Sequence, residues 1–175
     1  MYPSAYIDYL VHFHGDRDYF ECHEVLEEYW KEDEPGMRKD YWVGFIQVAV
    51  SLYHHRRSNF GGARRMMKNA LQIFEKEREA VRKLGLDEIS LIELIHHQLT
   101  QLENKEHYKS INLPINDEKL VQLCIDRCME KGIVWMNDSD LSNEFIINKH
   151  KLRDRTEVIE ERKLQKKRKQ RTFEL

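Results

Sequence analysis

The sequence predicts an all-α protein, built as an up-and-down antiparallel bundle of about five helices with a charged helical C-terminal extension. Three observations predict this fold. Proline and glycine are scarce, at three and seven of 175 residues. Apolar residues recur with a period near 3.6 over long segments. The breaks between these segments are short, which makes consecutive helices antiparallel neighbours.

Capping residues and a glycine delimit the first two helices. We expect a short helix over residues 4–14 that stops at Gly15. Asp18 then caps a second helix, with Glu21 in the capping-box position three residues later. This second helix ends near Lys31, before the turn EDEPGM. The pattern therefore predicts two neighbouring helices joined by a tight connection.

Three longer helices complete the predicted bundle. The third covers residues 40–58 and is apolar nearly all round, which is typical of a central helix covered on most sides. The fourth follows the break SNFGG and covers residues 62–84. The stretch KLGLDE then supplies a glycine C-cap and an aspartate N-cap, and opens a fifth helix that runs to about Glu106.

The chain divides into three parts by composition. Residues 1–108 form the helical bundle domain. Residues 109–148 combine an extended segment with a helix over residues 117–131, closed by Gly132, and we expect both to pack on the bundle. Residues 149–175 form a basic charged tail, a helix candidate with too few apolar positions to join a core.

Composition indicates a reduced cytoplasmic protein. No run of 18 apolar residues is present, and the N-terminal residues lack a basic region and a small-residue cleavage site, so we expect neither a membrane span nor a secretory signal. The three cysteines have no disulfide-framework spacing. Cys124 and Cys128 lie four apart on a predicted helix, and buried thiols are favoured over a metal clip because no second pair exists.

The charge is distributed unevenly along the chain. Residues 149–175 hold eleven Lys and Arg against five Asp and Glu, and the rest of the chain holds 18 against 26. The run KLQKKRKQR has no interleaved aromatic residues for base stacking, so a solvated helix is favoured over a nucleic-acid contact. An acidic protein surface remains a possible partner, including the acidic stretch 16–34 of the same or a neighbouring chain, which leaves a homo-oligomer open.

The stretch YFECHEVLEEYW, residues 19–30, places ionisable groups on a predicted core helix. At 100° per residue, one broad face holds the following side chains: Phe20, His23, Leu26, Glu27 and Trp30. Another group points to solvent: Glu21, Val25 and Glu28. Glu24 lies on the border between these faces. His23 and Glu27, four residues apart, are therefore stacked neighbours on the apolar side.

The third predicted helix carries a narrow polar strip of its own. Its members recur on one helix face: Gly44, Gln47, Ser51, His54 and Ser58. An unpaired buried polar group costs on the order of 1–3 kcal/mol. We therefore expect His23 and Glu27 to face Gln47 and His54 between the second and third helices.

Such a cluster suits a divalent metal, Zn, Mn, Fe or Ni, held by imidazole and carboxylate groups. His23, Glu27 and His54 are the candidate ligands. The residues expected to support them are the following: Gln47, Trp30, Ser51 and Asn59. Whichever of Glu24 and Glu27 does not bind the metal is a candidate general base. No H-E-x-x-H motif is present. A hydrogen-bonded network that fixes the helix register is the alternative, and the spacing leaves both open.

Three blocks of the sequence carry a family resemblance: FHGDRDYFECHEVLEEYW, GFIQVAVSLYHH and SNFGGARRMMKNAL. Over about residues 5–105 the chain resembles the domain of unknown function 309 family. The resemblance implies a small all-helical bundle, often labelled a predicted metal-dependent hydrolase, and implies no substrate. The matching motif positions are the following: His23, Glu24, Glu27, Trp30, Gln47, Asn59, Gly62 and Ala63.

Two positions depart from the family pattern. His14 stands where the pattern has Asn and adds another candidate ligand, and Ser58 replaces a Gly before Asn59. Asn59 with Gly61 could also open a phosphate cradle, but a helix–helix turn capped by Asn59 is favoured because no P-loop Lys follows.

Two functions from different classes follow. The first is a cytoplasmic divalent-metal-binding protein, hydrolytic if the family label holds. The second is a non-enzymatic helical interaction module with a structural polar network and a basic tail that docks a partner.

Overall fold

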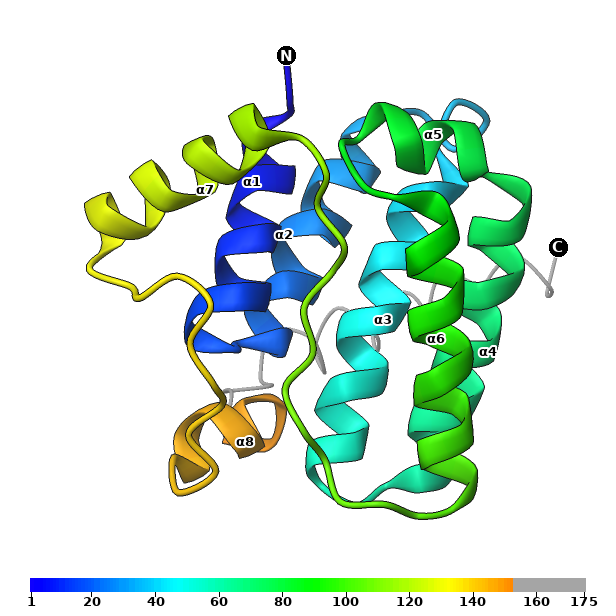
Figure 1. The fold of residues 1–175 in the computed structure, drawn as a ribbon, viewed down its shortest axis with the longest axis vertical. Coiled ribbons are helices and arrows are strands. Elements are labelled where there is room, and N and C mark those ends of the chain that lie inside the picture. Colours follow the sequence, from blue (N-terminus) through cyan, green and yellow to red (C-terminus); the bar gives the residue numbers. More distant parts are fainter. Residues whose placement is uncertain (153–175) are drawn as a thin grey trace, which may run out of the picture.

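The computed structural model describes residues 1–152, and Figure 1 shows their arrangement as a packed set of helices. Within these residues the regular elements are all helical, apart from one isolated bridge between Leu86 and Ile115. The all-α prediction is therefore confirmed.

The first four α-helices lead from the N-terminus through the centre of the bundle. They are α1 (Ser4–Val11), followed by the π-helical turn η1 (His12–Asp16), then α2 (Tyr19–Glu32), α3 (Asp40–Arg56) and α4 (Phe60–Lys76). The remaining helices are α5 (Arg78–Lys83), α6 (Glu88–Glu103), α7 (Glu118–Lys131) and α8 (Glu144–Leu152).

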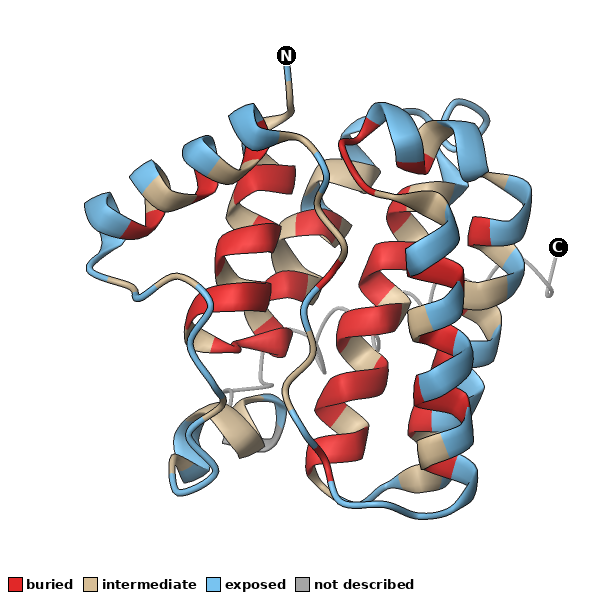
Figure 2. Cartoon of the chain, viewed as in Figure 1, coloured by how far each residue is buried: buried red, intermediate tan, exposed pale blue. Residues whose placement is uncertain are grey.

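The helices pack as a row with α3 in the middle. α3 contacts α2 on one side and α4 on the other, α1 and α7 continue the row beyond α2, and α6 packs on α4. Figure 2 shows the buried residues along the inner faces of these helices. α3 and α4 approach closely because Gly44 has no side chain: a Cβ there would lie 2.8 Å from Phe74 Cε1.

Predicted capping residues are confirmed at three helix ends. The Asp18 side chain accepts a hydrogen bond from the Glu21 amide at 3.0 Å and caps α2. Asn59 caps α4 in the same way, which supports the turn interpretation of this stretch over a phosphate cradle. Gly132 ends α7 in the left-handed region at φ 67°.

The predicted fourth helix over residues 62–84 is wrong as one element. The chain forms α4 and α5 instead, with Glu77 between them at φ −103° and ψ 27°. This change of direction places Val81 in the core, fully buried. Neither glycine nor proline marks the break, because packing rather than local propensity causes it.

The segment 104–117, between α6 and α7, crosses the bundle from one end to the other without regular structure (Figure 1). The Leu113 amide donates to His14 Nε2 at 2.9 Å. Arg17, 1% exposed, donates to the Ile111 carbonyl at 2.6 Å and to Phe13 and Asn137 carbonyls elsewhere in the chain. Two buried side chains near the start of α2, His14 as an acceptor and Arg17 as a donor, therefore hold this segment on the bundle.

α8 lies against the beginning of α2. Lys149 Nζ donates to the Asp18 carboxylate and, at 2.7 Å, to Glu21 Oε2. The basic run predicted at residues 163–171 lies outside the described residues. Among the helices of residues 1–152, none combines the length and apolar character that crossing a membrane requires.

Candidate metal centre

Three ionisable side chains from one turn of α2 meet at the helix surface. His23 Nδ1 lies 3.0 Å from Glu24 Oε1, and His23 Nε2 lies 3.0 Å from Glu27 Oε2. One ligand atom from each of the three lies within 4.8 Å of the others. The stacking of His23 and Glu27 thus follows the four-residue helical spacing, and Glu24 joins from the neighbouring position.

The cluster places an acceptor on each nitrogen of one imidazole ring. A neutral imidazole carries a single N–H and can donate to only one carboxylate. A neutral ring can therefore donate to one of the two carboxylates, and its other nitrogen offers a lone pair that can bind a metal ion. The side chains are 29%, 23% and 33% exposed for His23, Glu24 and Glu27, so an ion from solvent can reach them.

A cavity of about 200 Å³ lies between α2, α3 and α8, with His23 in its wall. The apolar and aromatic part of the lining comes from Tyr19, Phe20, Val50 and Tyr53. The basic part comes from His23, His54, Arg57 and His150. His23 and His54 therefore share one cavity, whereas Glu27 and Gln47, which were expected to meet there as well, do not line it.

A hydrogen-bond chain fixes the proton on His54. The Gly62 backbone amide donates to Asn59 Oδ1 at 3.1 Å. This contact identifies the oxygen of the Asn59 side chain, so the other atom of that side-chain amide, Nδ2, is the NH₂ group. Asn59 Nδ2 lies 3.1 Å from His54 Nδ1 and must donate to it. The His54 proton then resides on Nε2, which makes this ring a hydrogen-bond donor.

The charge state of His54 agrees with this assignment. Burial, followed by the positive charges of Arg57 and Arg65, lowers the pKa of His54 below its ordinary value. His54 is therefore neutral at pH 7. Coordination of a metal through Nε2 would require loss of the proton that the Asn59 contact places there.

The predicted polar strip of α3 divides between two neighbours. Ser51 Oγ donates to the Ala63 carbonyl of α4 at 2.7 Å, and Gly44 also faces α4. Gln47 Oε1 is buried and has no hydrogen-bond partner within residues 1–152. This acceptor is open to a donor such as a bound water. Ser51 thus serves the α3–α4 contact, not the cavity.

Two comparisons with known proteins identify the family. The model of the "Domain of unknown function (DUF309)" matches residues 6–66. A relative from Bacillus subtilis (strain 168), described as "Uncharacterized protein YpuF", is 60% identical over 162 residues, which cover 93% of each chain. The chain belongs to the DUF309 family. No solved structure matches it.

The match to the DUF309 model covers α1, α2, α3 and the first turns of α4, and so includes His23, Glu24, Glu27 and His54. α8 lies outside the matched residues. Its His150 nevertheless lines the cavity, and its Lys149 holds the start of α2. In this DUF309 chain the C-terminal part therefore completes a surface that the matched core begins.

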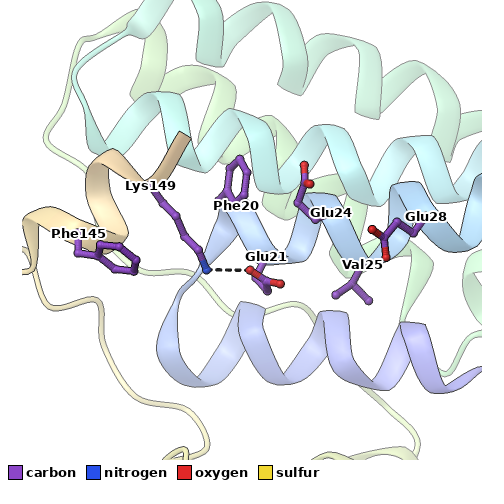
Figure 3. Close-up of a pocket in the computed structure, with 7 residues that line it drawn as sticks. All are labelled: Phe20, Glu21, Glu24, Val25, Glu28, Phe145 and Lys149. Carbon is purple, nitrogen blue, oxygen red and sulfur yellow. Dashed lines mark hydrogen bonds and ion pairs between the residues drawn. The ribbon is translucent and has the colours of Figure 1, made fainter. Parts of the chain in front are cut away.

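The outer face of α2 borders a second, larger hollow (Figure 3). This groove has a volume of about 400 Å³, and carboxylates from α2 line it: Glu21, Glu24 and Glu28. Phe145 and Lys149 of α8 form its other side. Glu21 is partly exposed, as predicted, with 37% of its side chain accessible, but it also pairs with Lys149 of α8, which the sequence did not indicate.

His14, a candidate ligand by position, is instead part of the core. Its Nδ1 donates to the Leu10 carbonyl at 2.9 Å, and its Nε2 accepts from the Leu113 amide. Burial lowers the pKa of His14 to about 4. Since both ring nitrogens are engaged by the backbone, His14 has no nitrogen left for a metal.

Sequence reasoning missed several groups that line the cavity. Tyr53 directly precedes His54 in α3, and Arg57 follows it just beyond the end of that helix, so proximity to His54 in the sequence was the available signal. His150 comes from a segment almost one hundred residues farther along the chain, for which no local pattern gives a signal. Trp30, expected to support the ligands, stacks under Arg38 at 4.5 Å and leaves its buried Nε1 without a partner in the described chain.

Proposed function

We propose that the chain binds a divalent metal ion through His23, Glu24 and Glu27 and uses it in hydrolysis. The observation that carries the proposal is the convergence of three donor atoms within 4.8 Å beside a cavity. An imidazole with carboxylates suits Zn, Mn, Fe or Ni, and the partial exposure of all three side chains leaves coordination positions for water.

Such an ion supplies Lewis acidity and lowers the pKa of a bound water. The side chains around it have separate roles. His23 and Glu27 hold the ion, and Glu24 either completes the ligand set or takes the proton from the attacking water. Gln47 lines neither the cavity nor the groove, so its role is limited to holding a buried water through the oxygen that has no partner within residues 1–152.

His54 acts from the opposite wall of the cavity. Its Nε2–H, fixed by the Asn59 contact, is a donor for a substrate oxygen. The family label of a predicted metal-dependent hydrolase agrees with this division of roles. The proposal goes beyond that label in assigning His54 as a donor and not as a ligand.

The test is metal uptake by the full chain. Calorimetric titration with Mn²⁺ and Zn²⁺, paired with elemental analysis of the native protein, should show one ion per chain. His23→Ala should weaken binding by at least about 100-fold, since one of three ligands is lost. His97→Ala, at an exposed position on α6, is the matched control and should bind as the unaltered chain does.

Two results would overturn the metal site. One is native protein with no bound ion and no heat of binding. The other is equal affinity in His23→Ala and the unaltered chain. If the ion binds, Glu24→Gln then separates the carboxylate roles: retained metal with lost turnover of nitrophenyl esters makes Glu24 the base, and lost metal makes it a ligand.

A non-enzymatic interaction module is the second candidate, and one observation favours it. Glu27 Oε1 also pairs with Lys31 Nζ at 2.8 Å, so the carboxylates of this turn take part in an ion network without a metal. In that case His23→Ala should lower the melting temperature equally with and without added metal. A metal-dependent difference between the two melting curves excludes the purely structural role.

A further inference from the structure

The cavity beside the proposed metal centre differs in charge from the groove on the other face of α2. Three carboxylates line the groove, whereas the polar lining of the cavity consists of imidazole, guanidinium and phenol groups. Within residues 1–152, no carboxylate belongs to the cavity wall. The two hollows therefore attract ligands of opposite charge, and a substrate anion fits only the cavity.

Arg57 provides a positive charge that no carboxylate within residues 1–152 neutralises through an ion pair. It lies just beyond α3, stacks on Tyr53 at 5.3 Å and donates to the Tyr53 hydroxyl at 3.3 Å. Within residues 1–152 it forms no ion pair with a carboxylate. Its remaining N–H groups can bind an oxyanion in the bidentate geometry that guanidinium favours.

Two histidines add ring nitrogens from different elements. His54 comes from α3 and His150 from α8, whereas both nitrogens of His23 already face carboxylates. The proton on His54 Nε2 follows from its Asn59 contact. A tetrahedral oxyanion with several acceptor oxygens matches donors arriving from several directions, whereas a carboxylate has only two oxygens to offer.

We propose that this cavity binds the phosphoryl group of a phosphate-ester substrate, with Arg57 as its charge partner and His54 and His150 as further donors. The inference rests on the proposed metal site, whose ligand His23 also lines this cavity. Clamping a phosphoryl group between an arginine and a metal ion stabilises the charge that develops on its oxygens. A volume of about 200 Å³ holds that group and a few further heavy atoms.

α8 contributes a cavity residue, His150, and a neighbouring residue, Lys149, that fastens the helix to α2. Lys149 binds the carboxylates of Asp18 and Glu21, and the next residue, His150, lines the cavity. The His150 ring also packs edge-on to Phe20 at 6.0 Å between centroids. Lys149 is therefore a positioning residue for His150.

The experiment uses the full chain loaded with Mn²⁺ and inorganic phosphate as the probe. Mn²⁺ affinity is measured first by calorimetry. Enhanced ³¹P relaxation of phosphate then reports phosphate held near the paramagnetic ion. Arg57→Gln should weaken phosphate binding at least about tenfold and leave Mn²⁺ affinity within about twofold. Arg64→Gln, at an exposed position on α4, should change neither quantity.

The possible failures are distinguishable. A chain that binds no Mn²⁺ overturns the metal site and this inference with it. A chain that binds Mn²⁺ but gives no added ³¹P relaxation overturns the phosphoryl assignment alone. So does Arg57→Gln with unaltered phosphate affinity, or acetate that displaces phosphate at equal concentration. His150→Ala with a several-fold loss of phosphate affinity supports the role of α8, and unchanged affinity removes His150 from the site.

Discussion

Acidification should destabilise the fold through His14, and the size of the effect follows from its surroundings. Burial lowers the pKa of His14 to about 4 in the folded chain, against about 6.5 for an unfolded histidine. Between about pH 6.5 and pH 4, His14 becomes protonated in the unfolded chain but stays neutral in the folded chain. Each pH unit of difference corresponds to about 1.4 kcal/mol, so the loss reaches about 3 kcal/mol at pH 4.

The direction of the effect follows from the hydrogen bonds of the neutral ring. His14 accepts from the Leu113 amide through Nε2, and a proton on that nitrogen would turn the acceptor into a second donor. The stabilising contribution is therefore complete above about pH 6.5 and decreases as the pH falls toward 4. The crossing segment 104–117, which Leu113 anchors, should be released first.

His14→Asn isolates this contribution. Asn can still donate to the Leu10 carbonyl but leaves the Leu113 amide without its acceptor, which should cost about 1–3 kcal/mol at pH 7. Urea unfolding of both chains between pH 7 and pH 4 gives the free energy of unfolding. The difference in free energy of unfolding between the unaltered chain and His14→Asn should change by about 3 kcal/mol, in favour of the variant, as the pH falls from 7 to 4.

The carboxylates common to both chains cancel in this difference. His97→Asn, at an exposed position, serves as the control and should follow the unaltered chain at every pH. Parallel curves for the unaltered chain and His14→Asn would refute the reasoning. Such a result would mean that His14 is protonated in the folded chain. A proton on Nε2 is incompatible with the hydrogen bond that this atom accepts from the Leu113 amide.

Three further variants test contacts that hold the helices. Gly44→Ala should destabilise the fold by about 1–3 kcal/mol, seen as a lower melting temperature, because its Cβ would lie 2.8 Å from Phe74. Arg17→Met should cost at least about 3 kcal/mol in urea unfolding, since four oxygen atoms lose the hydrogen bonds of this buried guanidinium. Lys149→Met should speed amide hydrogen exchange in α8 selectively, because its pairs with Asp18 and Glu21 fasten that helix.

Local chemistry made several helix ends predictable. Asp18 and Gly132 act through hydrogen bonds and backbone angles within a few residues, and both occur as the sequence indicates. The break at Glu77 was not predictable in this way. Its neighbours have ordinary helix propensity, and the chain turns there so that Val81 reaches the core.

In the candidate site, too, the features set by local geometry were predictable and those set by packing were not. His23, Glu24 and Glu27 meet because helical geometry makes them neighbours, so spacing alone identifies them. The sequence pattern of α3 did not show which neighbouring helix each of its polar residues faces. Ser51 and His54, assigned to one strip, consequently contact different partners, one on α4 and the other in the cavity.

The role of His54 shows why a histidine's position does not determine its chemistry. A ligand histidine needs a free ring nitrogen without a proton, and the group on its other nitrogen decides which one is free. Here Asn59 donates to Nδ1, so Nε2 keeps the proton. To reverse this, the Asn59 amide would have to rotate, which would break its cap on Gly62 at a cost of about 1 kcal/mol. The α4 cap therefore favours His54 as a donor to substrate even when a metal is bound nearby.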